Sequence, residues 1–213
     1  MPYKQIAVKL GISPSSAFNW TRDIKLTAEQ MEFNVRGPRG PQSPEQIARR
    51  AEIISARART RRAAFQEEGR RTARMGNPQH LAGCMLYWAE GAKQKNCVKL
   101  ANSEVAMLVF FRRFLTECFS VEPAKIAFSL HVYLGNHLTI EQIETHWLDA
   151  LQMPPECLRK HSINPLPTSS SGKKRARLPY GVGTLSCCST AIVQHIFSAI
   201  QEYAGFDEPR WLG

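Results

Sequence analysis

Hydrophobic and polar positions in residues 1–36 predict short helices separated by turns. Apolar residues recur at helical spacing in two groups, Ile6, Ala7 and Leu10 and then Ala17, Trp20 and Ile24. Gly11 interrupts the first group. Ser13 and Pro14 begin the second helix, because serine caps a helix N-terminus and proline is accepted at the first helical position. We therefore expect a helix, a turn and a helix, with both apolar groups buried.

A long polar helix is expected next. Thr27 and Gln30 have capping-box spacing and predict a third short helix, and the Pro- and Gly-rich segment 37–46 is typical of a linker. A helix then runs from 44 to about 75 and is closed by Gly76-Asn77-Pro78. Its arginines surround the axis, and its apolar edge is weak. This predicts an exposed basic connector lying along phosphates, with partial disorder as the alternative.

From residue 80 onward the pattern alternates between helices and strands. Helices are predicted at 80–91, 104–119, 140–151 and 189–205, and strands at 97–101, 125–134, 158–165 and 180–189. Asn102-Ser103 and the Thr139/Gln142 capping box open two of these helices. The polar segment 168–179 reads as a turn, with 180–189 as its return strand. The pattern predicts the α+β class with three parts: 1–36, a small all-α part; 37–79, a linker and basic helix; and 80–213, a mixed α/β domain.

The distribution of charge indicates a polyanionic partner. The 213 residues carry a formal net charge of +10. Residues 1–79 hold 15 Lys and Arg against 7 Asp and Glu, a net of +8, and the remainder holds 13 against 11, a net of +2. Arginine predominates in the basic part, and its guanidinium matches phosphate geometry. Nucleic acid is therefore the first candidate, and a solvated helical face is the alternative.

Composition also excludes several classes of protein. No apolar run reaches the length of a membrane span, and the N-terminus does not read as a signal peptide. The six cysteines form no CxxC pair and no His/Cys cluster with zinc spacing, so we expect no structural zinc site. Reduced, buried thiols and a cytoplasmic location associated with the nucleoid fit this pattern.

Residues 4–24 resemble a helix-turn-helix. The resemblance is carried by a small residue at Ala7, by Gly11 and Ile12 in the turn, and by an aromatic at Trp20. It implies that the second helix enters the major groove and contacts bases and phosphates through Ser15, Ser16, Asn19 and Arg22. An ordinary helical hairpin is the alternative.

The stretch LAGCMLYWAEGAK, residues 81–93, predicts an apolar helix that ends at Glu90-Gly91. A carboxylate in the last turn lies at the unfavourable, negative end of the helix dipole. The small residues Ala82, Gly83 and Ala89 would let another helix approach closely. If that helix belongs to a symmetry mate, two Glu90 carboxylates could hold divalent cations against a phosphate. The alternative is that Glu90 bonds backbone amides or Lys93.

GCMLYWAEG, with a strand and NSE (102–104) after it, resembles a divergent motif of the LAGLIDADG homing-endonuclease family. Glu90-Gly91 falls where the family has its terminal acid and glycine. The resemblance implies a curved sheet behind a pair of motif helices, with Glu90 as the ligand of catalytic Mg²⁺. The family's central lysine has three candidates here, Lys93, Lys95 and Lys160. A single motif implies a homodimer on pseudo-palindromic double-stranded DNA.

Three functions follow from these observations. One is a Mg²⁺-dependent DNA endonuclease, and the second is a DNA-binding transcription regulator on the same scaffold without cleavage, as in some relatives that carry a helix-turn-helix. The third is a basic interaction protein, with RNA as one partner, although the chain lacks an aromatic-interleaved RNA motif. Phosphate contacts are predicted from basic residues outside the first helices: Arg57, Arg61, Lys95, Lys160, Lys173, Lys174, Arg175 and Arg177.

Overall fold

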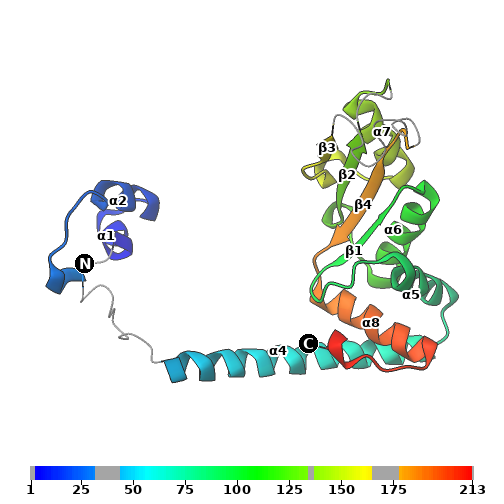
Figure 1. Ribbon diagram of the computed structural model, residues 1–213, viewed down its shortest axis with the longest axis horizontal. Coiled ribbons are helices and arrows are strands. Elements are labelled where there is room, and N and C mark those ends of the chain that lie inside the picture. The colour runs from blue at the N-terminus through cyan, green and yellow to red at the C-terminus, as the bar shows by residue number, and fades with distance from the viewer. Residues whose placement is uncertain (1–2, 32–43, 134–136, 165–177, 213) are drawn as a thin grey trace. The chain divides into compact units, whose positions relative to one another are not determined.

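The computed structural model describes residues 3–31, 44–133, 137–164 and 178–212 (Figure 1). The chain divides into two compact units, Met1–Ala56 and Arg57–Gly213. Within the described ranges, no helix has both the length and the apolar character needed to cross a bilayer.

The N-terminal unit contains two short helices joined by a tight turn. Helices α1 (Tyr3–Leu10) and α2 (Pro14–Thr21) meet through the buried Ala7 and Ala17. Gly11 has a φ of +63°, which a glycine adopts without strain. The predicted cap is confirmed, since the Ser13 side chain accepts a hydrogen bond from the Ser16 N–H and Pro14 opens the helix. The capping box of Thr27 and Gln30 is confirmed as well, and residues 28–31 are helical.

The predicted core of this unit is wrong at three positions. Leu10, Trp20 and Ile24 are exposed to 60%, 68% and 59%. Helix α2 ends at Thr21, so Ile24 lies beyond the helix whose stripe it was expected to extend. Two helices of eight residues bury only the alanines where they touch, and the larger apolar side chains stay on the surface.

Helix α4 (Pro44–Arg74) has the predicted bounds, but its last turns are not an exposed connector. Gln66, Gly69 and Ala73 are buried, and they share one helical face. A Cβ at Gly69 would overlap the carbonyl oxygen of His195 and the Ser198 Oγ, both in helix α8 (Thr190–Ala204). This part of α4 therefore packs closely along α8, as Figure 1 shows.

Polar contacts fix the same packing. Gln66 Nε2 donates to Gln194 Oε1 at 2.8 Å, and Gln194 Nε2 donates to the Lys95 carbonyl at 3.2 Å. Near the end of α4, Arg74 forms an ion pair with Glu202 of α8 at 2.8 Å. The buried amide of Gln194 thus joins α4 to the loop before the first strand.

The rest of the C-terminal unit follows the predicted order of elements, and the α+β class is confirmed. Its elements are α5 (Pro78–Glu90), β1 (Val98–Asn102), α6 (Val105–Phe119), β2 (Ala127–Tyr133), α7 (Ile140–Leu151), β3 (Ser162–Asn164), β4 (Val182–Cys187) and α8, with short 3-10 turns at Pro123–Lys125, Pro155–Cys157 and Pro209–Trp211. The capping box of Thr139 and Gln142 opens α7 as predicted. Helix α6 begins at Val105, with Asn102 Oδ1 accepting from the Glu104 N–H.

The described strands form a four-stranded mixed sheet in the order β1-β4-β2-β3. β4 pairs antiparallel with β1 and β2, and β3 pairs parallel with β2. The predicted pairing of β3 with β4 as its return strand is therefore wrong. α7 carries the chain from β2 to a parallel partner on one side, which leaves the other side of β2 for β4.

The core lies between the helices and one face of this sheet (Figure 1). The ring of Tyr87 in α5 stacks on Phe111 of α6 at 6.0 Å, and Phe128 of β2 packs against Trp147 of α7 at 5.8 Å. A Cβ at Gly83 would overlap the Phe114 ring, so α5 and α6 approach closely at this glycine. The helices cover one face of the sheet. The side chains that alternate with the buried ones along each strand lie on the opposite face.

A chain of hydrogen-bonding groups joins α5 to α8 within the core. The His80 ring contacts the Tyr203 hydroxyl at 2.8 Å through Nδ1 and His195 Nε2 at 3.0 Å through Nε2. Burial lowers the pKa of His80 and, together with the neighbouring His80, lowers the pKa of His195 to about 4. Both rings are therefore neutral near pH 7, and they serve the packing of the two helices.

Candidate nucleic-acid interface

The side of the sheet opposite the helices presents small and polar side chains. Along β2 and β4, residues alternate between buried and half-buried, and the strand register aligns the half-buried ones on one face. Lys99 pairs with Ser186, and Thr184 pairs with Ser129, across neighbouring strands. We call this surface the open face, and its members are Lys99, Ala101, Ala127, Ser129, His131, Tyr133, Ser162, Asn164, Val182, Thr184 and Ser186.

The open face carries hydroxyl groups and one cation. Ser129, Thr184 and Ser186 bring hydroxyls that donate and accept, and Lys99 brings a cation at the β1 edge. Its described members include no carboxylate to repel phosphate. Three strand spacings of ~4.8 Å make the sheet about 14 Å wide, wider than the ~12 Å DNA major groove, which admits a two-stranded β-ribbon. Two neighbouring strands of the open face, rather than the whole sheet, match the width of such a groove.

Hydrogen bonds and a ring contact hold in place the part of the open face that β2 forms near β3. The Leu130 N–H donates to His161 Nδ1 at 3.1 Å, and His161 Nε2 lies 2.8 Å from Glu144 Oε1. His131 and Tyr133, both on the open face, pack edge to face with ring centroids 5.2 Å apart. The polar surface thus rests on a connection between β2, the segment before β3, and α7.

Glu90 lies at the end of α5, exposed, and the chain supplies the missing cation there. Lys93 Nζ donates to the Trp88 carbonyl at 2.7 Å, which places an ammonium at the negative end of the helix. Among the described residues, Glu90 has no hydrogen bond or ion pair. The alternative in which Glu90 bonds Lys93 or backbone amides is therefore not what the structure shows.

Gly91 ends α5 as predicted, for a reason that the sequence did not reveal. Its φ of −75° is accessible to any residue, but a Cβ would overlap the ring and carbonyl of Tyr87. The Tyr87 hydroxyl donates to the Ala92 carbonyl at 2.5 Å, and Gly91 bridges to Leu100 of β1. The position of the Tyr87 ring over the end of α5 thus requires glycine here.

The face of α5 that carries Gly83 is not available to a symmetry mate. Gly83 and Tyr87 pack on α6 of the same chain. The other two small residues expected at a helix interface, Ala82 and Ala89, are exposed, with Leu81 beside them. A second copy could therefore approach α5 only through the Ala82 and Ala89 side, whereas Glu90, seven residues after Gly83, lies nearer to the Gly83 side.

A single chain does not build a magnesium site in the part that the structure describes. Mg²⁺ prefers several oxygen ligands in octahedral geometry. No group of three or more His, Cys, Asp or Glu side chains comes together among the described residues, and Glu90 is the one carboxylate that α5 offers at this end. The expected Mg²⁺ therefore does not fit one chain alone.

The predicted DNA contacts of the N-terminal unit divide into two groups. Ser15, Asn19 and Arg22 are exposed on or just after α2. Ser16 is half-buried, and its Oγ lies 2.8 Å from the Ser13 Oγ within the helix cap, so it belongs to the cap. The surface available for contact is formed by the first three.

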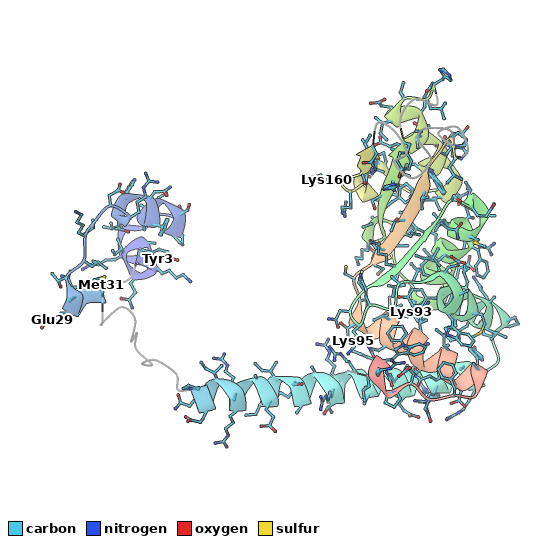
Figure 2. The ribbon with its side chains drawn as sticks, in the orientation of Figure 1. Tyr3, Glu29, Met31, Lys93, Lys95 and Lys160 are labelled. Atoms are coloured by element: carbon cyan, nitrogen blue, oxygen red, sulfur yellow. The ribbon has the colours of Figure 1, made fainter. Side chains whose placement is uncertain are left out.

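The predicted basic contacts of the C-terminal unit are exposed but dispersed. Arg57 and Arg61 lie on α4, Lys95 in the loop before β1, and Lys160 before β3. Figure 2 shows Lys93 and Lys95 near one end of the sheet and Lys160 near the other, so the three lysine candidates do not converge on one point. The other four predicted basic contacts, Lys173, Lys174, Arg175 and Arg177, lie outside the described residues.

The open face itself was missed by sequence reasoning. The alternation in KIAFSLHVYL revealed a strand but not which of its two faces the helices would cover. Lys99 and His131 carried no motif that could have marked them. Comparison of the chain with protein-family models, with curated proteins and with solved structures finds no match.

Proposed function

We propose that this chain binds double-stranded DNA without cleaving it, as a transcription regulator does. The observation that carries the proposal is the open face, a polar sheet surface with Lys99 and no described carboxylate, in a chain of net charge +10. In this proposal α1 and α2 form a helix-turn-helix, and Asn19 and Arg22 read base edges. Each unit would then offer a DNA-contacting surface of its own.

The C-terminal unit is proposed to be a divergent LAGLIDADG-like domain. Support comes from α5, which ends at Glu90-Gly91 and continues into a backbone bridge with β1, and from helices that cover one face of a four-stranded sheet. The exposed Ala82 and Ala89 support a homodimer through α5. This arrangement implies pseudo-palindromic DNA as the ligand.

Cleavage is the second candidate, and it rests on Glu90 alone. The Glu90 carboxylate is exposed and has no hydrogen-bond or ion-pair partner among the described residues, so its oxygens are free to coordinate a cation. Because one chain offers too few oxygen ligands for Mg²⁺, a dimer that brings in a second Glu90 is a condition for this function.

The experiment is a selection of bound sequences from a random duplex library, followed by affinity measurements over a range of salt. Lys99→Ala should weaken binding and make the slope of log K against log[salt] shallower by about 0.9, the value for one phosphate contact. Lys125→Ala is the matched control, an exposed lysine outside the open face that pairs with Glu122 at 3.2 Å. Absence of duplex binding at low salt, or equal effects of the two substitutions, would contradict the proposal.

A further inference from the structure

A basic pocket lies where α4 passes the N-terminus of α8 in the C-terminal unit. Its cavity has a volume of about 520 Å³. Arg57, Arg61 and Arg62 line it from α4, Ser189 and Thr190 from the start of α8, and Asn96 from the loop before β1. We call it the arginine pocket.

The positive charge of the arginine pocket is not compensated by the residues around it. None of the lining residues is acidic. Arginines further along α4 are paired, since Arg70 lies 3.6 Å from Asp207 and Arg74 lies 2.8 Å from Glu202. No ion pair of this kind is found for Arg57 or Arg61 among the described residues. Uncompensated guanidinium groups around a concavity favour an anion.

Two of the arginines are held in position by their surroundings. Arg62 Nη1 donates to the Leu212 carbonyl at 3.2 Å, and the Arg61 guanidinium lies 5.6 Å from the centre of the Phe65 ring. A side chain that is already held in place loses less conformational entropy when a ligand binds. The cationic wall of the pocket is therefore partly organised without a ligand.

The opposite wall adds hydrogen-bond donors. Helix α8 has fifteen residues, and the Ser189 side chain accepts from the Ile192 N–H, so the N–H groups of Thr190 and Ala191 are those that the helix itself leaves unused. Thr190 Oγ1 donates to Asn96 Oδ1 at 3.3 Å, which helps to orient the Asn96 amide so that its NH₂ can donate to a ligand. Cations on one wall and donors on the other match the needs of a phosphate.

We propose that the arginine pocket binds the phosphate of a nucleotide, either a free nucleoside phosphate or a nucleotide unit of nucleic acid. Its volume lies within the range of ~300–1,000 Å³ that is typical of small-molecule sites, so it has room for more than one phosphate group. The arginines hold the phosphate from the α4 side, and the donors of Asn96 and of the start of α8 hold it from the opposite wall. This proposal does not rest on DNA binding by the open face.

The test uses the full chain with ADP and inorganic pyrophosphate as probes, measured by calorimetry. The variant Arg57→Ala/Arg61→Ala should bind both probes at least tenfold more weakly, because it removes two guanidinium groups that make charge-assisted hydrogen bonds to phosphate. Both side chains are exposed, so the fold should persist, and a thermal melt checks that it does. Arg49→Ala/Arg50→Ala is the matched control, with two exposed arginines on the same helix outside the pocket, and it should bind normally.

Competition with duplex DNA distinguishes the two sources of phosphate. If a duplex displaces ADP from the wild-type chain, the pocket takes a nucleotide of the DNA; if ADP stays bound to DNA-saturated protein, it takes a free nucleotide. The proposal is overturned if neither probe binds at millimolar concentration, or if the control variant loses as much affinity as the pocket variant. A chain that fails to bind DNA but binds ADP would refute the proposed function and leave the pocket intact.

A second observation, independent of the pocket's charge, concerns two thiols at the same end of the sheet. Cys97 precedes β1 and Cys188 follows β4, one residue beyond the paired Val98 and Cys187, and their sulfurs are 3.0 Å apart. Opposite residues of antiparallel strands have Cα atoms about 4.5–5.5 Å apart, within the range that a disulfide spans. Cys188 is exposed, and burial raises the pKa of Cys97 to about 12.

We infer that Cys97 and Cys188 form a disulfide when the chain meets a hydroperoxide. The Cys188 thiolate attacks the peroxide oxygen and becomes a sulfenic acid as hydroxide leaves; the Cys97 sulfur then attacks the Cys188 sulfur and releases water. With hydrogen peroxide, two thiols and one peroxide give one disulfide and two waters.

Mass spectrometry after titration with hydrogen peroxide tests the reaction. The chain should lose two hydrogens, and a peptide linking Cys97 to Cys188 should appear. Cys188→Ser should abolish the linked peptide, whereas Cys118→Ser, which removes a half-buried cysteine elsewhere, should leave it unchanged. Accumulation of Cys188 sulfinic acid without any linked peptide would overturn the inference.

Discussion

Replacing Gly69 by alanine tests whether the last turns of α4 belong to the core. A glycine inside an exposed helix costs about 1 kcal/mol relative to alanine, so Gly69→Ala would stabilise an exposed connector by about that amount. In the structure Gly69 is buried, and a Cβ would overlap the His195 carbonyl oxygen and the Ser198 Oγ. The exposed-connector description therefore predicts that Gly69→Ala raises the stability of the fold, and the packed description predicts that it lowers it.

The overlap with the His195 carbonyl and the Ser198 Oγ sets how much stability Gly69→Ala should remove. Overpacking a well-packed site costs typically about 1–3 kcal/mol. Gly69→Ala falls at the upper end of that range, because the backbone carbonyl of His195 cannot rotate away as a flexible side chain could. After the gain in helix propensity of about 1 kcal/mol, the net loss of stability is about 1–2 kcal/mol. The melting temperature should fall by about 2–4 °C for each kcal/mol.

Urea unfolding of the full chain, followed by tryptophan fluorescence, measures the effect. Trp147 is buried and Trp20 is exposed, so the change in signal reports chiefly the C-terminal unit. Glu67→Ala is the control, an exposed position in the same turn of α4, and it should change stability by less than about 0.5 kcal/mol. A higher urea midpoint for Gly69→Ala than for wild type would refute the packing of α4 on α8.

Three further predictions concern titration, DNA recognition and cleavage. Burial lowers the pKa of His80 and takes that of His195 to about 4. The neutral rings therefore contribute fully to folding stability above about pH 6.5, and this contribution is lost as pH falls towards about 4, because the unfolded chain binds the protons first. His195→Gln should flatten the dependence of the urea midpoint on pH over this interval, and slopes equal to those of wild type would contradict this. Asn19→Ala with Arg22→Ala should relax the selected DNA sequence, each lost base contact costing about 1–3 kcal/mol, and an unchanged preference would exclude base reading by α2. Glu90→Gln should leave DNA affinity nearly unchanged, and it should abolish any Mg²⁺-dependent nicking by the wild type; nicking that survives the substitution would remove Glu90 from the chemistry.

Local signals in the sequence determined where most elements begin and end. Pro44 and the Gly76-Asn77-Pro78 segment bounded α4 to within two residues of its observed limits, and the Thr139/Gln142 capping box opened α7 where predicted. These signals act through hydrogen bonds and backbone preferences within one or two helical turns. The chain needs no distant partner to express them, which is why the order of helices and strands could be predicted.

Local patterns could not show which surface each element would bury. The spacing of Gly83 was compatible with contact between two chains, and only the fold placed Phe114 of α6 against it. The alternation in β2 was compatible with burial of either face until α7 placed Trp147 against Phe128.

Tertiary structure also decided the surfaces on which function is proposed to depend. The open face requires β4 to lie between β1 and β2, and the arginine pocket requires α4 to pass the start of α8. The Gln66–Gln194 bond that helps to place α4 joins residues 128 positions apart. Pairings of this kind depend on the packing of whole elements and on the entropy of closing long loops, and neither quantity is encoded in a short stretch of sequence.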